Sequence, residues 1–325
     1  MTPNYPLSAA ERQLPAILVT GGCGFIGANL VRHLSGKGYK IKVLDNLSTG
    51  KKDNLLTASC RLSIANLIVG DIRDRDAVEK AVKGIGTVVH LAAHTSVTES
   101  LDNPKEDWDI NVTGTLNLLE TCRLKGIKTF IFASSNAVLG EQPPPVNETK
   151  IPKPLSPYGA AKLAGEALCS AYHHSFGLNT ICLRFANCYG PYSDHKTSVI
   201  SRFMKWVKEG KPLIIYGDGE QTRDFIHVDD VCQAIHLCLV TADQISGEVF
   251  QIASGVETSI NELADIIKEI VAVSVQILHE PKRGGEIERN YSDITKAKRV
   301  LSFEPKVKLS DGLEKLYRSY GTKTK

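Results

Sequence analysis

Short apolar runs alternate with longer amphipathic stretches from residue 16 to residue 185. The apolar runs end in glycine, aspartate or serine, as buried parallel strands do, and the amphipathic stretches repeat their apolar residues at helical spacing. Strict alternation of strand and helix predicts an α/β fold, a Rossmann-like doubly wound parallel sheet with helices on both faces. We expect strands at 16–20, 40–45, 66–70, 87–92, 128–134 and 180–185, and helices at 25–34, 75–82, 104–124 and 157–176.

The alternation loosens after residue 187, where shorter strands and helices mix. We expect this second half to form a smaller mixed α/β lobe that binds substrate over the carboxyl ends of the sheet strands, where ligands of open α/β sheets bind. The strand at 249–252 is expected in this lobe. The predicted divisions are a loose N-terminal leader at 1–15, a Rossmann domain at 16–187 and the lobe at 188–325, with 218–242 returning to the Rossmann domain.

Composition narrows the class of protein. The chain has 325 residues, 42% of them hydrophobic and 23% charged, which is typical of a globular protein. A net charge of +3 without runs of like charge argues against nucleic acid and anionic membranes as main partners. No apolar stretch approaches the roughly 18 residues of a spanning helix, and the eight cysteines show no metal-ligand spacing. We therefore expect a cytoplasmic protein with reduced thiols and no metal site.

A glycine-rich turn, TGGCGFIG from Thr20, joins the first predicted strand to the first helix. Its glycines allow a tight turn, let the backbone approach a pyrophosphate closely and let the helix lie against the strand. The helix N-terminus then supplies N–H donors to the phosphates. The alternative is a glycine-rich turn without a ligand. The turn predicts a dinucleotide site made by Gly21, Gly24, Phe25, Ile26 and Gly27.

Two aspartates that follow the next strands indicate which dinucleotide binds. Asp45 ends the second strand, where its carboxylate can accept both hydroxyls of the adenosine ribose and would repel a 2′-phosphate. This position favours NAD over NADP. Asp71 and Ile72 follow the third strand and could hold the adenine by its amino edge and an apolar face. The alternative for Asp71 is that it caps the helix that follows.

A tyrosine and a lysine four residues apart carry the predicted chemistry. Tyr158 and Lys162 lie on one face of the helix that Pro157 begins, and Ser135 ends the preceding strand, facing the same cleft. A free phenol has a pKa of about 10, so a base at neutral pH needs that pKa lowered by about three units, which Lys162 and a cationic nicotinamide can supply. Ser135 would hydrogen-bond the same substrate hydroxyl. The alternative is a helix-surface pair with a capping serine.

These motifs belong to a longer ordered set that carries a family resemblance. From residue 16 to residue 318 the chain resembles the extended short-chain dehydrogenase/reductase family, and within it nucleotide-sugar 4-epimerases of the UDP-glucose 4-epimerase type. The resemblance implies NAD as cofactor, a UDP-sugar as substrate and a homodimer built on helices 104–124 and 157–176. The segments are TGGCGFIG, DNLSTG at 45–50, HLAA at 90–93, SSNAVLG at 134–140, SPYGAAKLAGE at 156–166, LRFANCYGP at 183–191 and TRDFIHVDD at 222–230.

The resemblance also implies roles for single residues. The family's catalytic serine and YxxxK pair correspond to Ser135, Tyr158 and Lys162. Asn111 matches the asparagine that anchors the active site, and Asn187 matches the residue that binds the substrate phosphates. Arg223 and Arg283 match two arginines that clamp the pyrophosphate, a role suited to a planar charged fork. Further cofactor-binding residues are Asn46, Ser48, Thr49, Gly50, Leu91, Ala92 and Ala93, and further substrate-binding residues are Asn136, Val199 and Tyr216.

The residues after Ser135 bear on the reaction. In the family, dehydratases carry an Asp–Glu pair there and UDP-glucuronate decarboxylases carry a glutamate, whereas this chain has Asn136 and Ala137. The resemblance therefore favours an epimerase that oxidises C4 of a UDP-hexose to a 4-keto intermediate and reduces it from the other face. The alternatives are a UDP-glucuronate 4-epimerase, a dehydratase or decarboxylase, and a catalytically silent NAD-binding protein.

Two positions bear on the substrate. The family has a large tyrosine at one place in enzymes confined to unacetylated sugars and a smaller residue in those that accept N-acetylhexosamines, and this chain has Asn290 there. Its size and its amide predict turnover of UDP-GlcNAc and UDP-GalNAc; the alternative is that Asn290 only caps a turn. Leu139 stands where the family commonly has tyrosine, which affects either substrate or packing.

Overall fold

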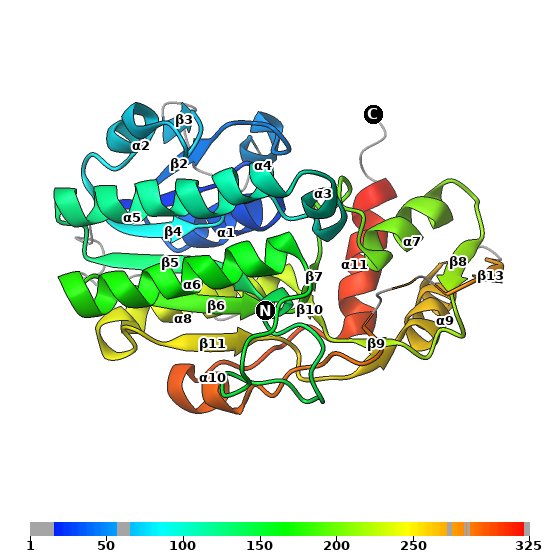
Figure 1. Ribbon diagram of the computed structural model, residues 1–325. Helices are drawn as coiled ribbons and strands as arrows, with labels where there is room; N and C mark the ends of the chain where they lie inside the picture. The colour runs from blue at the N-terminus through cyan, green and yellow to red at the C-terminus, as the bar shows by residue number, and fades with distance from the viewer. Residues whose placement is uncertain (1–15, 57–65, 272–274, 283, 285–286, 322–325) are drawn as a thin grey trace.

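A seven-stranded parallel sheet forms the centre of the larger part of the molecule (Figure 1). The computed structural model describes residues 16–56, 66–271, 275–282, 284 and 287–321. The strand order is β11-β6-β5-β4-β1-β2-β3, so the winding reverses between β1 and β4, and the predicted doubly wound fold is confirmed. The strands are β1 (Ala16–Thr20), β2 (Ile41–Asp45), β3 (Leu67–Val69), β4 (Ile85–His90), β5 (Thr129–Ser135), β6 (Asn179–Phe185) and β11 (Val249–Ile252).

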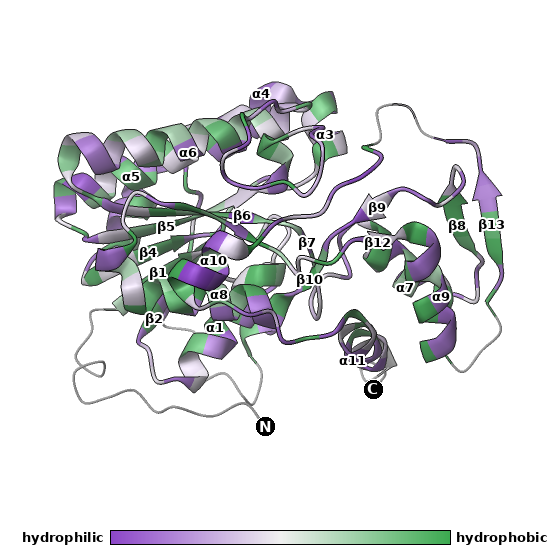
Figure 2. Cartoon of the chain, turned by 90° about the horizontal axis from the view of Figure 1, so that it is seen from below, coloured by the Kyte–Doolittle hydropathy of each residue, from purple (hydrophilic) through white to green (hydrophobic). Residues whose placement is uncertain are grey.

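Helices cover both faces of this sheet, which gives three layers (Figure 2). Because side chains alternate along a strand, Ile17 of β1 enters the core with α1 and α8, and Leu18 enters the core with α2, α5 and α6. The helices on the first face are α1 (Phe25–Gly36) and α8 (Val228–Thr241), and those on the second are α2 (Arg75–Ala81), α5 (Gly114–Lys125) and α6 (Pro157–Phe176).

Helix α6 begins and ends where its sequence predicts. The Ser156 hydroxyl accepts a hydrogen bond from the backbone N–H of Gly159, and Pro157 occupies the first helical position. Gly177 ends the helix in the left-handed conformation, with φ of 70°. The predicted range 157–176 is confirmed, and Tyr158 and Lys162 lie in the first two turns.

The helix expected at 104–124 contains a π-helical turn. The chain forms α3 (Val97–Asp102) and α4 (Pro104–Trp108), then a π-helical turn η4 (Asp109–Thr113), and only then α5. A π turn holds an additional residue within its hydrogen-bonded ring and often marks a functional site. The predicted helix therefore forms over 104–125, and only its π turn was not predicted, because such a turn has no residue signature of its own.

The smaller lobe has its own core, to which Phe203, Leu263 and Leu313 contribute (Figure 1, right). Its strands pair in twos, β8 with β13 in parallel and β9 with β12 in antiparallel. The short parallel pair of β7 and β10 lies between lobe and sheet. These elements are β7 (Asn187–Tyr189), α7 (Val199–Lys208), β8 (Leu213–Tyr216), β9 (Thr222–Arg223), β10 (Phe225–His227), β12 (Thr258–Ser259), α9 (Ile260–Ile270), β13 (Ile277–Glu280) and α11 (Leu309–Gly321).

The chain crosses between sheet and lobe several times. Helix α8 packs on α1, β11 pairs with β6 in the main sheet, and α10 (Thr295–Leu301) packs on β11. The strand at 249–252 therefore lies in the sheet, although we expected it in the lobe, because an apolar run does not specify its partner strand. Short 3₁₀ turns occur at η2 (Lys52–Leu55), η5 (Asn136–Val138) and η6 (Ala242–Gln244).

Candidate active site

The glycine turn after β1 is packed too tightly for side chains. Gly21 has φ of 67°, and a Cβ built on it would lie 2.8 Å from Cα of Ala92, after β4. A Cβ on Gly27 would lie 2.1 Å from the carbonyl oxygen of Gly21. The turn therefore leaves the N-terminus of α1 free of side chains on the side where β1 and β4 diverge, which fits a pyrophosphate.

Asp45 lies at the end of β2, beside this turn. Its two carboxylate oxygens accept the backbone N–H groups of Cys23 and Leu47, each at 2.8 Å. Burial raises the pKa of Asp45, and these two hydrogen bonds oppose that rise. A Cβ on Gly50 would lie 2.7 Å from the carbonyl carbon of Cys23, so the 45–50 loop packs directly on the glycine turn. The lone pairs left on Asp45 suit the ribose hydroxyls of NAD.

Asp71 does not cap the following helix. Asp74 is the N-cap of α2, and its side chain accepts the backbone N–H of Asp76. The Asp71 carboxylate instead accepts hydrogen bonds from Asn46 at 2.9 Å and from the Arg73 guanidinium at 2.8 and 2.9 Å, which holds its pKa well below the usual range. The capping alternative is therefore wrong. Asn46 and Asp71 lie together next to Asp45.

The three candidate catalytic residues come together at the carboxyl end of β5. The Ser135 hydroxyl interacts with the Tyr158 phenol and lowers its pKa, and it accepts the backbone N–H of Ala137 at 3.2 Å. The Lys162 ammonium lies 5.9 Å from the centre of the Tyr158 ring and donates to the Ala133 carbonyl at 2.8 Å. Tyr158 and Lys162 are both buried, so one helix and one strand end fix the group.

Burial controls the proton affinities here. It raises the pKa of Tyr158 to about 12 and lowers the pKa of Lys162 to about 8. We expected Lys162 to lower the pKa of Tyr158, but in the protein alone the Ser135 hydrogen bond is the contact that lowers it. For Tyr158 to ionise near pH 7, a ligand bound beside it must therefore supply a positive charge.

Asn111 is buried in the π-helical turn and holds the loop after β4. Its amide oxygen accepts the backbone N–H of His94 at 3.0 Å. Its amide nitrogen donates to the His94 carbonyl at 2.9 Å and to the Asp107 carboxylate at 3.0 Å. We expected Asn111 to anchor the active site through the neighbouring helix, and these contacts are the ones such a role needs.

His90 belongs to the site, although nothing in the HLAA motif singled it out. Its Nδ1 lies 2.8 Å from the Thr20 hydroxyl, which accepts the backbone N–H of Leu91 and of Ala92. Its Nε2 lies 3.0 Å from the Thr115 hydroxyl, which donates to the Asn111 carbonyl. Burial lowers the pKa of His90 to about 3, so the ring is neutral. This chain of hydrogen bonds joins the glycine turn to the π-helical turn.

The candidate substrate residues nearest the sheet are Asn136 and Asn187. Asn136 is buried, and its amide donates to the Ser292 hydroxyl at 2.8 Å. Asn187 is exposed and donates to the Asp224 carbonyl at 3.3 Å. Leu139 is fully buried against Val138 and Val146, so its difference from the family affects packing.

The remaining candidate substrate residues belong to the lobe. The Arg223 guanidinium donates to the carbonyls of Thr222 and Ile287, both at 2.7 Å. Asn290 is half-buried, and its backbone N–H donates to the Thr222 carbonyl. Val199 begins α7 and Tyr216 ends β8, both in the lobe. Arg283 is outside the described residues.

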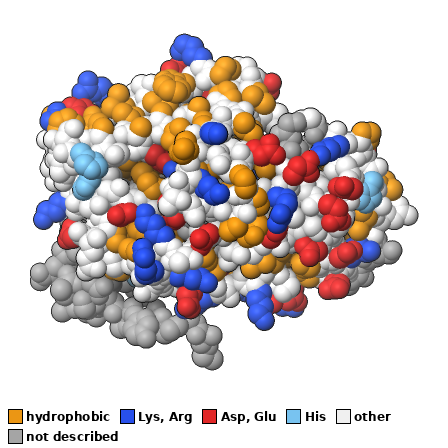
Figure 3. Space-filling model, turned by 60° about the horizontal axis from the view of Figure 1, so that its bottom comes forward, with side chains coloured by type: hydrophobic (Ala, Val, Ile, Leu, Met, Phe, Trp, Pro, Cys, Tyr) orange, Lys and Arg blue, Asp and Glu red, His pale blue; other side chains and the backbone are white. Residues whose placement is uncertain are grey.

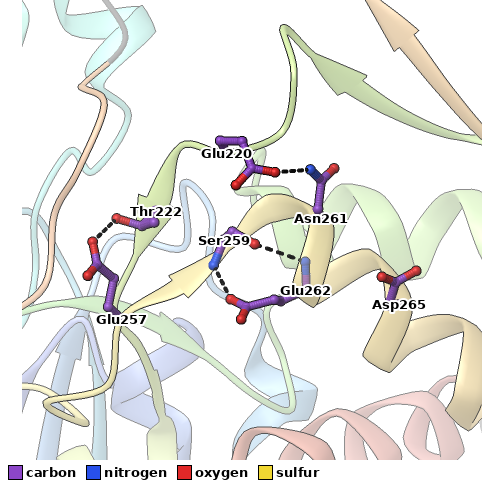
Figure 4. Close-up of a pocket in the computed structure, with 7 residues that line it drawn as sticks. All are labelled: Glu220, Thr222, Glu257, Ser259, Asn261, Glu262 and Asp265. Atoms are coloured by element: carbon purple, nitrogen blue, oxygen red, sulfur yellow. Dashed lines mark hydrogen bonds between the residues drawn. The ribbon is translucent and has the colours of Figure 1, made fainter.

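A polar hollow of about 420 Å³ lies in the lobe, where acidic side chains gather (Figures 3 and 4). Thr222 donates to Glu257 at 2.6 Å, and Ser259 and Glu262 form the capping box of α9. The acidic lining would repel an anionic sugar nucleotide, so this hollow is not the active site. It is lined by Glu220, Thr222, Glu257, Ser259, Asn261, Glu262 and Asp265.

Among the described residues, no group of three His, Cys, Asp or Glu side chains is placed to hold a metal ion. Within the same residues, no helix is both long and apolar enough to span a bilayer.

Fold and site together define an NAD-dependent enzyme of the short-chain dehydrogenase/reductase type. The chain belongs to the NAD dependent epimerase/dehydratase family, which it matches over residues 17–253. NAD is accordingly its cofactor, as the glycine turn and Asp45 predict.

Three solved structures are similar to the whole chain. The UDP-glucose 4-epimerase of Thermotoga maritima, with UDP-glucose, is 36% identical, with a TM-score of 0.89 over 95% of this chain and 100% of that one. The UDP-N-acetylglucosamine 4-epimerase of Methanobrevibacter ruminantium, with UDP-N-acetylmuramic acid, is 32% identical, with a TM-score of 0.88 over 96% and 99%. The UDP-glucuronic acid 4-epimerase of Bacillus cereus, with UDP-glucuronic acid and NAD, is 34% identical, with a TM-score of 0.86 over 94% and 99%.

Proposed function

We propose that the chain is an NAD-dependent 4-epimerase of UDP-hexoses, with Ser135, Tyr158 and Lys162 as its catalytic residues. The observation that carries this proposal is the grouping of Ser135 at the end of β5 with the buried Tyr158 and Lys162 of α6, whose ammonium lies 5.9 Å from the centre of the phenol ring. A protein that only binds NAD has no need of a phenol held in this way.

Each residue has a step to perform. Tyr158 takes the proton of the C4 hydroxyl during oxidation and returns a proton when the 4-keto sugar is reduced. Ser135 hydrogen-bonds the same hydroxyl, and the positive charge of the nicotinamide, when bound, would join that of Lys162 in favouring the phenolate form of Tyr158. NAD, when bound, accepts a hydride from C4 and gives it back. Asn187 and Arg223 hold the phosphates while the 4-keto sugar rotates to present its other face.

The same site argues against elimination of water. A dehydratase needs an acid and a base beside the oxidised sugar, and neither Asn136 nor Ala137 can exchange a proton near neutral pH. The Asn136 amide is moreover directed at Ser292. Epimerisation needs only the groups that are present.

For the substrate we propose UDP-GlcNAc and UDP-GalNAc, turned over as well as or better than UDP-Glc and UDP-Gal. Asn290 leaves more room than a tyrosine would, and its amide can hydrogen-bond an acetamido group. The similar epimerase of M. ruminantium, named for UDP-N-acetylglucosamine, supports this choice. UDP-glucuronate is the second candidate, supported by the similar enzyme of B. cereus.

We also propose a homodimer formed through the helices of the second sheet face. Trp108 of α4 and Leu116 and Leu124 of α5 are all exposed. Phe176, at the end of α6, is exposed as well. Light scattering at micromolar concentration should give twice the monomer mass, and L116D should halve it. A monomeric wild type would refute this proposal.

The test of the function is a panel of UDP-sugars with product identification. The purified protein should carry NAD(H) and interconvert the acetylated pair, the plain pair or both. Release of NADP on denaturation would overturn the cofactor assignment. No epimer from any UDP-hexose, or a 4-keto-6-deoxy product, would overturn the proposed reaction.

Tyr158→Phe should lower kcat by at least about 100-fold, the usual contribution of a positioned acid/base group, while NAD content stays unchanged. The control is Tyr192→Phe, since Tyr192 also precedes a lysine by four residues but lies in a turn. Equal losses in the two variants would show that the helical pair is not the catalytic one.

A further inference from the structure

His94, in the loop after β4, is held between two carboxylates. Its Nδ1 lies 2.8 Å from Asp107 of α4, and its Nε2 lies 2.8 Å from Glu99 of α3. Carboxylate oxygens only accept, so both ring nitrogens must donate, and a neutral imidazole has only one N–H. His94 is therefore an imidazolium in this arrangement, and the two hydrogen bonds raise its pKa although burial lowers it.

The partners of His94 reach the catalytic helix from two sides. Ser100, the residue after Glu99, is buried, and its hydroxyl accepts the backbone N–H of Tyr158 at 3.2 Å. Asp107 is completely buried. Within the described residues its Oδ2 has no hydrogen-bond partner, so the charge of this carboxylate is offset only through Oδ1, which faces His94 and Asn111.

Asp107 acts electrostatically on the candidate catalytic pair. Burial is the main cause of the high pKa of Tyr158, and the Asp107 charge raises that pKa further. Burial lowers the pKa of Lys162, and the Asp107 charge opposes this. An unbalanced Asp107 would therefore disfavour the phenolate form of Tyr158.

We propose that His94 is a positioning residue for proton transfer: its imidazolium holds Asp107 and offsets the negative charge that this carboxylate places beside Tyr158. The nearby charges balance: Glu99 of α3, Asp107 of α4 and Glu166 of α6 are negative, and His94, Lys162 of α6 and Arg184, which pairs with Glu166, are positive. Loss of the His94 charge leaves a net negative site next to a phenol that must ionise. The effect on catalysis rests on the proposed function, but the effect on the phenol does not.

His94→Gln tests this, because glutamine can still donate to Asp107 but carries no charge. In the NAD-loaded protein, the ultraviolet titration of Tyr158, taken as the difference from Tyr158→Phe, should move to higher pH by roughly half to one unit. The acid limb of kcat/KM should move by the same amount, so that kcat/KM at pH 7 falls roughly three- to tenfold with NAD content unchanged. The control is His174→Gln, on the far end of α6, where the ring hydrogen-bonds the Ser170 carbonyl and packs against the ring of His173.

The outcomes separate the two proposals. A phenol titration that does not move, or an equal loss of kcat/KM at every pH, would mean that His94 is only structural. If no UDP-sugar is turned over, the proposed function fails, and the phenol titration still decides the role of His94. If His94→Gln does not fold, ¹⁵N shifts of the wild-type ring decide: two protonated nitrogens at pH 7 support the proposal, and a neutral ring overturns it.

Discussion

The sheet domain and the lobe each contain an arginine–glutamate fork, an ion pair with two hydrogen bonds. The first fork is buried and the second is mostly exposed. In the sheet domain Arg184 donates to both oxygens of Glu166, at 2.9 and 2.8 Å, and about 5% of the arginine side chain is exposed. In the lobe Arg289 donates to both oxygens of Glu257, at 2.8 Å each, and 57% of its side chain is exposed. Geometry is the same in the two forks, and burial is not.

This contrast extends to the candidate site. Among the residues proposed for cofactor and chemistry, Asp45, Tyr158 and Lys162 are buried, and Asp45 and Lys162 are fixed by backbone contacts. Among those proposed for the sugar nucleotide, Asn136 is buried, but Asn187 is exposed and Asn290 is half-buried. The cofactor half of the site therefore tolerates few substitutions, whereas substitutions in the sugar-nucleotide half can change the substrate without disturbing the fold.

The largest expected effect lies in the glycine turn. Gly27→Ala should abolish NAD retention, because its Cβ would lie 2.1 Å from the Gly21 carbonyl oxygen, and neither backbone can move away. Gly36→Ala, in the same helix, places its Cβ where no atom lies within 4 Å and should stabilise the protein by about 0.5–1 kcal/mol. NAD released from equal amounts of each protein is the measurement, and full retention by Gly27→Ala would contradict the packing described.

The next effect compares the two forks directly. Glu166→Gln leaves the Arg184 charge buried without a counter-charge and should lower the free energy of unfolding by about 3 kcal/mol. Glu257→Gln, with its partner mostly in water, should lower it by less than about 1 kcal/mol. Urea unfolding of both variants measures this. Equal losses of unfolding free energy in the two variants would mean that burial of the ion pair does not change its contribution to stability.

The smallest effect concerns specificity. Asn290→Tyr should lower kcat/KM for the acetylated UDP-sugars about tenfold more than for the plain pair, since the added ring would occupy the acetamido space. Asn290→Ser keeps the space open and should leave the ratio unchanged. An equal effect of Asn290→Tyr on both pairs would remove the basis for the substrate proposed.

Local signals in the sequence predicted the elements that are stabilised locally. Helix α6 is marked at both ends, by Ser156 with Pro157 and by Gly177, and it forms over the predicted residues. The glycine turn and Asp45 are equally local, because each adjoins a strand end. The α/β fold class follows from the alternation of predicted strands and helices alone.

Features that depend on distant partners could not be predicted in this way. The apolar run at 249–252 shows that a strand forms but not that it pairs with β6. His94, Glu99 and Asp107 fall in a loop and two short helices without a shared period, so nothing in their spacing indicates one cluster. The pKa of Tyr158 depends on the burial that the whole domain creates, which no motif records.

The position of β11 at the edge of the main sheet has a consequence for how the protein is made. During synthesis β6 leaves the ribosome long before residues 249–252, because β7 to β10 and helices α7 and α8 are translated in between. Until then one side of β6 has no partner strand and presents unpaired backbone groups to other chains. A nascent chain stalled before β11 would therefore be prone to aggregate, and neither domain could be exchanged between relatives by a single crossover.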